Sequence, residues 1–259
     1  MGLSLRMQRV ADMVEPCERA ADIGCDHGYV SIYLVEQGIA DHVLAMDVRK
    51  GPLSRAEANI RQKQLQTRIE CRLSDGLERL QPGEADTILL AGMGGPLMID
   101  ILTKGSNKRL GTETLIVQPQ SDIPEVRRYL HRIGYEITAE DMLQEDGKYY
   151  TVMKAKPSAS DTATDADADT DTDTDTDTDT DKLWSEAEEQ YGKLLLEKQS
   201  PVLKQYLERE ERQLTQLQEQ LNHQATEKAN QRLAELQELL KWNREAQGYY
   251  EIKKHHELS

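Results

Sequence analysis

Near the start of the chain, glycines flank two adjacent ionisable side chains. Residues 22–29 read DIGCDHGY and follow an apolar run. Glycine allows a sharp backbone turn beside a ligand. The segment is not the GxGxxG loop of dinucleotide-binding proteins, because Asp26 and His27 stand where that loop has small residues. A carboxylate here would repel a pyrophosphate. The segment therefore favours a ligand with an ammonium group and no phosphate, such as S-adenosylmethionine, over the alternative of an ordinary turn.

A second candidate, Asp47, ends the apolar run HVLAMDV, 23 residues after Gly24. A carboxylate at the end of a second strand can accept hydrogen bonds from both hydroxyls of a ribose. Enzymes that use NAD have the same device, so Asp47 alone does not distinguish between these cofactors. An isolated Asp after a strand can also cap a helix.

Two more loops follow later apolar runs. Residues 74–76 read SDG, and a side chain there can bond the amino group of an adenine; a helix cap is the alternative. Residues 91–96 read AGMGGP, whose glycines let a ligand approach the backbone closely. Methyltransferases that act on the exocyclic amine of adenine have an Asn/Asp-Pro-Pro-aromatic motif at this place. Its absence argues against such a target, and a purely structural turn is the other interpretation.

The elements that must position these loops alternate over the first 157 residues. Helices are expected at residues 4–14, from residue 29, at 52–63, 97–102 and 123–133, with a short helix after residue 75. The apolar runs between them are nearly continuous, as in parallel strands covered on both faces. Residues 135–156 then indicate two strands around Glu145-Asp146-Gly147. This order predicts an α/β fold, the doubly wound sheet of a class I (Rossmann-like) methyltransferase.

Composition divides the chain into three segments: a methyltransferase domain at 1–157, an Asp/Thr linker at 158–181 and a helical segment at 182–259. The linker holds ten Asp and no Lys or Arg, which predicts disorder. A calcium- or partner-binding role is the alternative to a tolerated repeat. The linker contributes −10 of the formal charge of −15, so the other segments are nearly neutral. The total charge therefore says little about their partners.

Leucines recur at helical spacing in residues 182–259. They are Leu203, Leu207, Leu214, Leu217, Leu221, Leu233, Leu236 and Leu240. A polar stretch at 222–226 interrupts them, which predicts two antiparallel helices in a coiled-coil hairpin. One uninterrupted helix is the alternative.

The cysteines and the apolar segments indicate a cytoplasmic protein. The three cysteines, Cys17, Cys25 and Cys71, form no CxxC pair, so neither a disulfide framework nor a structural zinc site is expected. The first residues lack the apolar core of a signal peptide, and no run approaches the roughly 18 apolar residues of a membrane span. We expect no contact with a membrane.

Several of these motifs together resemble one bacterial family. They are LSLRM at residues 3–7, DIGCDHGYV, the strand end at Asp47, SDG, AGMGG and IVQPQ at 116–120. They are similar to the TrmK family, which methylates N1 of adenine 22 in tRNA, and the resemblance covers residues 3–156. It implies a class I fold, S-adenosylmethionine as cofactor and tRNA as substrate. We expect no obligate protein partner. The Asp/Thr repeat is outside the family pattern.

The loops and this resemblance together give the candidate site residues. Candidates for cofactor binding are Arg6, Asp22, Gly24, Cys25, Asp26, His27, Asp47, Val48, Ser74, Asp75, Gly76, Ala91, Gly92 and Met93. Candidates for substrate binding are Tyr29, Gly94, Gln118, Pro119 and Gln120. Asp26, His27 and Tyr29 are the candidates for catalysis, and no metal is expected.

Methylation at adenine N1 would need little acid–base chemistry. The N1 lone pair is unprotonated at neutral pH, so the main task is to align N1, methyl and sulfur. The product ring gains positive charge, which a carboxylate such as Asp26 would stabilise. Tyr29 offers a stacking surface, and His27 could accept the N6 proton or orient Asp26. The alternative is that Asp26 and His27 only bind the cofactor.

An RNA substrate adds two requirements. N1 lies on the Watson–Crick edge, so the base must be unpaired or flipped out. Basic groups must also meet phosphates. Candidates in the first domain are Arg6, Arg9, Arg49, Lys50, Arg127, Arg128 and Arg132. Candidates in the helical segment are Lys193, Lys198, Lys204, Arg209, Arg212, Lys228, Arg232, Lys241 and Arg244, with ordinary inter-helix ion pairs to the acidic residues of the segment as the alternative.

Three other functions compete with this interpretation. A class I methyltransferase could act on another RNA, a protein or a small molecule. A non-enzymatic module could use the helical hairpin to recruit a partner, although the intact Asp47, SDG and AGMGG loops argue against it. An NAD-dependent oxidoreductase is disfavoured by the missing GxGxxG.

Overall fold

The computed structural model describes residues 2–109, 111–158, 184–223 and 226–251. The predicted linker at 158–181 lies outside the described residues except for Ser158.

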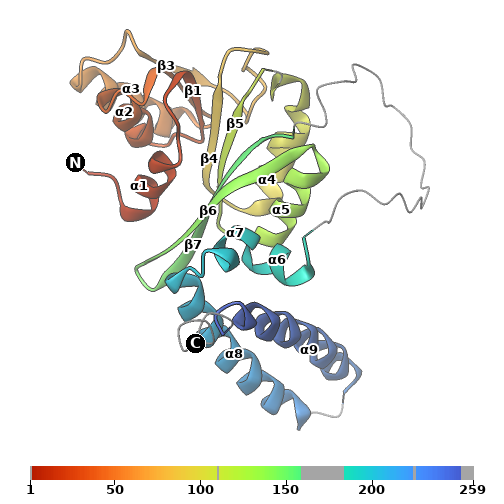
Figure 1. Cartoon of the computed structure of the whole chain (residues 1–259). Coiled ribbons are helices and arrows are strands. Elements are labelled where there is room, and N and C mark those ends of the chain that lie inside the picture. Colours follow the sequence, from red (N-terminus) through yellow and green to blue (C-terminus); the bar gives the residue numbers. More distant parts are fainter. Residues whose placement is uncertain (1, 110, 159–183, 224–225, 252–259) are drawn as a thin grey trace, which may run out of the picture.

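The described part of the chain contains one seven-stranded sheet in the order β3-β2-β1-β4-β5-β7-β6 (Figure 1). The strands are β1 (Cys17–Ile23), β2 (Ala40–Asp47), β3 (Ile69–Leu73), β4 (Thr87–Met93), β5 (Thr114–Pro119), β6 (Tyr135–Glu145) and β7 (Lys148–Pro157). The first five strands pair in parallel, and β7 runs antiparallel to both β5 and β6. This order confirms the predicted doubly wound sheet.

Helices cover both faces of the sheet. One face carries α1 (Leu5–Asp12), α2 (Tyr29–Glu36) and α3 (Lys50–Gln62), and the other carries α4 (Gly95–Lys104) and α5 (Ile123–Arg132) (Figure 1). A short 3₁₀ helix, η1 (Ser106–Arg109), precedes β5. Every residue of β5 is buried, as a strand covered on both faces requires. The core consists mainly of aliphatic side chains, and the chain has no Phe.

The short helix expected after residue 75 is wrong, because this segment folds as turns. The Ser74 hydroxyl accepts the Arg79 N–H (3.2 Å) and donates to the Gly76 carbonyl (3.0 Å). Gly76 has a φ of +50°, in the left-handed region that interrupts a right-handed helix. Local side-chain bonds of this kind compete with helix formation.

The predicted hairpin is confirmed as β6 and β7. Its two turn residues, Asp146 and Gly147, have φ values of 49° and 74°. Two positive φ values characterise the type I′ turn, whose twist matches that of the flanking strands. The hairpin extends past the end of β5, and its tip reaches the C-terminal helices (Figure 1).

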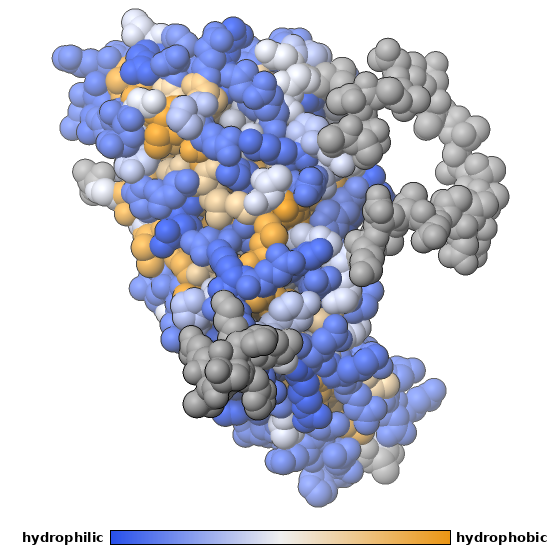
Figure 2. Space-filling model, viewed as in Figure 1, coloured by the Kyte–Doolittle hydropathy of each residue, from blue (hydrophilic) through white to orange (hydrophobic). Residues whose placement is uncertain are grey.

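The C-terminal segment contains α6 (Glu186–Tyr191), α7 (Lys193–Glu197), α8 (Pro201–Asn222) and α9 (Glu227–Gly248). Helices α8 and α9 lie side by side in opposite directions, so the predicted hairpin is correct and the single helix is not (Figure 1). The Thr226 hydroxyl caps α9 by accepting the Ala229 N–H. Their visible surface is mainly hydrophilic (Figure 2). No helix in the described ranges is long and apolar enough to cross a membrane.

The start of this segment corrects the expectation that residues 182–259 form only a hairpin. Helices α6 and α7 pack against α5 and β6, and Trp184 and Leu194 contact the core of the sheet domain. A second apolar cluster joins Met142 of β6 to Leu203 of α8. The helical hairpin is therefore attached to the sheet through a packed junction.

A buried ion pair lies at this junction. Arg127 Nε donates to Glu140 Oε1 at 2.8 Å, and both side chains are almost fully buried. Arg127 Nη1 also donates to the carbonyls of Glu189 and Gln190 at the end of α6, while Glu140 Oε2 accepts the Leu194 N–H at the start of α7. The expectation that Arg127 contacts phosphate is thus wrong.

We predict that Arg127→Ala lowers the free energy of unfolding by about 3–5 kcal/mol, because it leaves the Glu140 carboxylate buried without its partner. The neighbouring Arg128 is a matched control, since its ion pair with Glu186 is exposed. Arg128→Ala should cost less than about 1 kcal/mol. Urea unfolding of both variants checks this. Similar losses would contradict the role assigned to the buried pair.

Candidate active site

The loop after β1 is fixed to the end of β2 by its backbone. The N–H groups of Gly24 and Cys25 donate to the Met46 carbonyl at 2.8 and 3.0 Å. The Asp26 N–H then donates to Asp47 Oδ2 at 3.3 Å. Asp26 itself has a φ of 47°, so the loop turns through a left-handed residue. The two predicted loops are therefore one structural unit.

The side chain of Asp47 lies at the centre of this unit. It is 5% exposed, and its Oδ1 accepts the Arg49 N–H at 2.8 Å. A carboxylate has about four acceptor positions, so both oxygens can still accept hydroxyl groups. Val48, next in the chain, is strongly exposed beside it. The end of β2 thus combines a fixed anion with an apolar side chain, a pair that suits a nucleoside.

Asp22, within β1, is a buried carboxylate that accepts a hydrogen bond from Ser31 Oγ of α2 at 2.6 Å. Burial raises its pKa to about 6, and the nearby Asp47 adds to this effect. Cys25 is also buried, and burial raises the pKa of its thiol, which stays neutral. Asp22 therefore anchors the start of α2 through Ser31. Its buried negative charge lowers the stability of the fold when no cation lies nearby.

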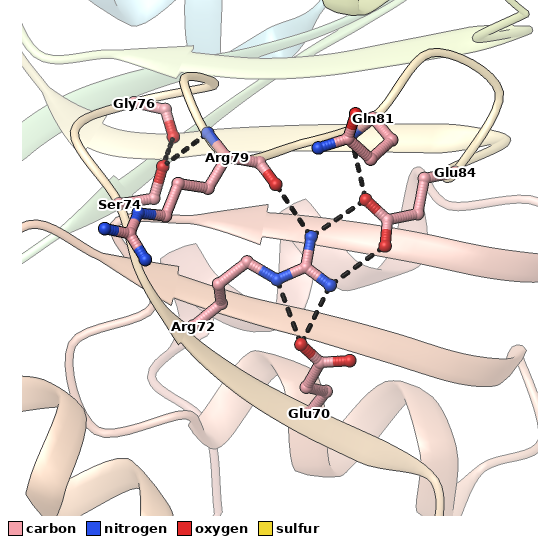
Figure 3. A network of polar contacts seen from close by, with 7 residues as sticks. All are labelled: Glu70, Arg72, Ser74, Gly76, Arg79, Gln81 and Glu84. Atoms are coloured by element: carbon pink, nitrogen blue, oxygen red, sulfur yellow. Dashed lines mark hydrogen bonds and ion pairs between the residues drawn. The ribbon is translucent and has the colours of Figure 1, made fainter.

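The loop after β3 is held by Arg72, at the centre of the network in Figure 3. Its guanidinium bonds both oxygens of Glu84 (2.8 and 2.9 Å), the Arg79 carbonyl (2.8 Å) and Glu70. The Arg72 cation keeps the pKa of Glu84 below its usual value. Since the Ser74 N–H also donates to the Asp47 carbonyl, the SDG loop has a fixed place beside β2.

The loop after β4 is shaped by Gln118 of β5. Gln118 Oε1 accepts both Arg6 Nη1 (2.9 Å) and the Gly92 N–H (3.2 Å), and its Nε2 donates to the Pro119 carbonyl. The Arg6 guanidinium also lies over the ring of Tyr150, 5.2 Å from its centroid. Gln118 was expected to contact substrate, but it is fully buried. We assign it a positioning role.

Close approaches explain two of the three glycines of AGMGG, Gly92 and Gly95. A Cβ at Gly95 would lie 2.6 Å from the Ser121 carbonyl oxygen, a distance that no side chain tolerates. Gly92 has a φ of +78°, and a Cβ there would lie 3.2 Å from Arg6 Nη1. The loop after β1 meets this loop where a Cβ at Gly24 would lie 3.1 Å from Met93 Cε. The candidate loops therefore border one continuous site.

The three catalytic candidates lie on the outer side of the first loop. The ring of His27 stacks on Tyr29 with 5.5 Å between centroids, and the His27 carbonyl accepts Asn59 Nδ2 of α3. His27 Nε2 is 3.6 Å from Asp26 Oδ2. The Asp26 side chain is 57% exposed, so its carboxylate faces solvent at the site entrance. These contacts leave their catalytic roles as proposals.

Exposed apolar side chains surround the same edge of the sheet. In the described ranges the large exposed ones are Leu5, Tyr29, Val48 and Leu97. All four lie at the start of α1, α2 or α4 or just after β2, and thus beside the candidate loops. Apolar surface concentrated around a polar site is typical of a ligand-binding edge. Within the described ranges, no cluster of three or more His, Cys, Asp or Glu could hold a metal ion.

Sequence patterns did not indicate several residues that shape the site. Ser31, Arg72, Glu84 and Tyr150 act on the loops through contacts between residues far apart in sequence. The motif NIRQKQ gave no sign that Asn59 would support His27. An arginine two residues before the SDG loop is the one sequence signal that could have suggested Arg72.

Comparison with known proteins identifies the family of this chain. Residues 3–153 match the family model described as a methyltransferase domain. The tRNA (adenine(22)-N(1))-methyltransferase of Bacillus subtilis (strain 168) is 38% identical over 161 residues, which are 62% of this chain and 68% of that protein.

Two solved structures are similar over nearly the whole chain. The B. subtilis m1A22 tRNA methyltransferase TrmK has 32% identity and a TM-score of 0.80, covering 95% of this chain and 98% of that one. A putative tRNA (m1A22) methyltransferase of Streptococcus pneumoniae in complex with S-adenosyl-L-methionine has 27% identity and a TM-score of 0.77, covering 95% and 99%. The resemblance of the sequence motifs is confirmed: the chain belongs to the TrmK family of bacterial tRNA (adenine-22 N1) methyltransferases.

Proposed function

We propose that this chain transfers a methyl group from S-adenosylmethionine to N1 of adenine 22 of tRNA. The observation that supports this best is the joined loop unit at Asp47, which combines a buried acceptor for a ribose with a carboxylate at Asp26. Membership of the TrmK family supports the choice of tRNA and of the N1 atom.

The residues present fit the cofactor. A Cβ at Gly24 would lie 3.1 Å from Met93 Cε and one at Gly92 would lie 3.2 Å from Arg6 Nη1, so these glycines let the two loops lie close together at the site. Asp47 would hold the ribose, Val48 and the SDG loop the adenine, and Asp22 and Asp26 the cationic end. When bound, S-adenosylmethionine supplies the methyl group as an activated sulfonium.

The protein's own task is positioning. Adenine N1 needs no base at neutral pH, so the chain must hold the target base in line with the methyl donor and exclude water. The glycines of AGMGG let the base approach the backbone, and Arg6, Gln118 and Gln120 fix the shape of that wall. The carboxylate of Asp26 can stabilise the positive charge that develops on the ring. Tyr29 offers a face on which the extruded base can stack.

We place this activity in the cytoplasm, without an obligate protein partner. The substrate tRNA is found there, and all three cysteines are free, which suits a reducing compartment. Among the described residues we propose 2–157 as the catalytic domain and the C-terminal helices as an accessory region. The assay below uses the purified chain alone, so it also tests the absence of an obligate partner.

We expect the purified chain to form 1-methyladenosine at position 22 of a tRNA transcript. The reaction should require labelled S-adenosylmethionine, and nucleoside mass spectrometry locates the product. A transcript with guanine at that position is the matched control and should take up no label. Label on another position, or as N6-methyladenosine, would contradict the proposal.

We predict that Asp47→Asn weakens binding of S-adenosylmethionine about ten- to a hundredfold. Loss of charge-assisted hydrogen bonds costs about 1.5–3 kcal/mol, which gives this range. Asp41→Asn, at the other end of the same strand and exposed, is the control and should leave affinity unchanged. Titration calorimetry measures both. Equal affinities of the Asp47→Asn and Asp41→Asn variants for S-adenosylmethionine would show that Asp47 does not bind the cofactor.

Asp22→Asn should stabilise the ligand-free protein at pH 7–8 by about 1–3 kcal/mol. The folded pKa of about 6 lies above the unfolded value of roughly 3.9, so between about pH 4 and 6 the folded state holds more protons than the unfolded state. Wild-type stability is therefore lost as pH rises from about 4 to 6, and the variant should lack this loss. Thermal unfolding across pH checks the sign.

Asp22→Asn also distinguishes the effect of Asp22 on stability from its effect on cofactor binding. If Asp22 faces the cationic end of the cofactor, Asp22→Asn binds S-adenosylmethionine more weakly although it is more stable. A variant that is more stable and binds equally well would show that Asp22 has no part in cofactor binding.

A further inference from the structure

A groove of about 510 Å³ opens between the tip of the β6–β7 hairpin and α8. Lys148 and Tyr150 line it from the hairpin, and Tyr206, Arg209 and Gln213 line it from the helix. Its volume falls within the range of roughly 300–1,000 Å³ that holds small-molecule ligands, enough for a nucleotide. No candidate residue predicted from the sequence accounts for this groove as a whole.

One end of the groove reaches the active site. Gln120 lines it, and the Gln120 N–H donates to the Met93 carbonyl of the AGMGG loop at 2.9 Å. Tyr150 also lines it, and its ring supports the Arg6 guanidinium that bonds Gln118. A polymeric ligand that extends from the AGMGG loop toward the C-terminal helices would therefore enter the groove directly.

The groove contains two cations without carboxylate partners. Lys148 and Arg209 are exposed, and neither forms an ion pair with a carboxylate in the described part of the chain. The Arg209 guanidinium lies over Tyr149, 5.9 Å from the ring centroid, and Nη1 donates to the Gly147 carbonyl at 3.3 Å. These contacts hold the cation at the groove and leave its other donors available.

The one carboxylate of the groove, Glu210, faces hydrogen-bond donors. Its oxygens accept the hydroxyls of Tyr191 and Tyr206 (both 2.7 Å) and Asn243 Nδ2 (2.9 Å). Burial raises the pKa of both tyrosines, so they remain protonated donors. Glu210 is thus screened by the helix junction, and the positive charge of Lys148 and Arg209 dominates the open side.

Several other basic residues of the C-terminal segment, unlike Lys148 and Arg209, have carboxylate partners. Lys198, Arg232, Lys241 and Arg244 pair with acidic side chains, and of these four pairs only Arg244–Glu211 joins the two helices, as the alternative expected. Lys204 has no such partner among the described residues, but it lies five residues from Arg209, about 140° around the α8 axis. It offers the same charge on a different face.

We propose that this groove binds the unpaired nucleotide next to the target adenine, with its phosphate between Lys148 and Arg209. The inference rests on the proposed function. A flipped base stays joined to its neighbours, whose backbone must leave the site along the protein surface. Aromatic side chains interleaved with cations are the surface that single-stranded RNA prefers. The groove begins at the wall where the target base must lie, which favours RNA over a protein segment.

The test compares two double variants with equal charge change. Lys148→Ala with Arg209→Ala removes the groove cations, and Lys204→Ala with Lys228→Ala removes two exposed cations elsewhere. The groove variant should bind tRNA about tenfold more weakly and raise KM for tRNA, with unchanged affinity for S-adenosylmethionine. Its salt dependence should flatten by between one and two log–log units, since each single-strand phosphate contact contributes about 0.7. The control variant should change each value much less.

Each outcome decides a separate point. Equal effects of the two double variants, or none, would overturn the groove while wild-type methylation stands. Failure of the wild type to methylate tRNA would overturn the proposed function, and tRNA binding by the two variants would still test the groove. If Arg209→Ala unfolds the hairpin tip, Lys148→Ala alone applies the same comparison against Lys204→Ala. The charge-retaining Arg209→Lys should restore most of the binding, and binding of an acidic peptide in place of RNA would refute the proposal.

Discussion

The parallel pairing of β1 with both β2 and β4 is the constraint on which the site depends. Parallel strands end at the same edge, so the loops after β1, β2, β3, β4 and β5 meet there. The helix after β1 covers one face and the helix after β4 covers the other, which leaves the edge between these strands open. The Asp47 carboxylate then joins the first two loops by accepting the backbone N–H groups of Asp26 and Arg49. A ligand at this edge meets a wall that is already ordered.

At the same edge the fold contains a buried carboxylate that lowers its stability. Asp22 is a carboxylate inside the sheet, and burial raises its pKa to about 6. An apolar side chain would pack there without that cost. The Ser31 hydroxyl compensates for part of it and ties β1 to α2. Buried charge of this kind is characteristic of functional sites.

A second buried charge has a different task. The Arg127–Glu140 pair bonds the end of α6 and the start of α7, and so orients everything that follows. Because α8 begins a few residues later, its position beside the β6–β7 tip depends on this pair and on the apolar cluster around Met142. The helical pair therefore has a defined place relative to the active site, and a groove can form between them.

A nearly neutral protein can hold a polyanion only if its positive charge is distributed unevenly. Three of the seven basic side chains of α8 and α9, and several of the sheet domain, lie in ion pairs with carboxylates. Lys148 and Arg209 are left without such partners near the active site. Local charge, rather than the formal total of −15, then decides where a phosphate is attracted.

The sequence by itself determined the sheet, the hairpins and the four candidate loops, which are DIGCDHGY, the strand end at Asp47, SDG and AGMGGP. Their signals are local: apolar runs give strands, glycines give turns with positive φ, and leucine spacing gives the helical pair. It also determined the family, since DIGCDHGYV and AGMGG are local motifs.

Only the tertiary structure decided which polar residues support the site and which lie on the surface beside it. Arg127 and Arg128 are neighbours in sequence, yet one is buried against Glu140 and the other is exposed beside Glu186. Gln118 lies in a motif that suggests substrate contact, but burial directs it to Arg6 and Gly92. Lys148 and Arg209, 61 residues apart in the chain, line one groove. Burial and pairing depend on contacts between distant segments, and no local pattern encodes them.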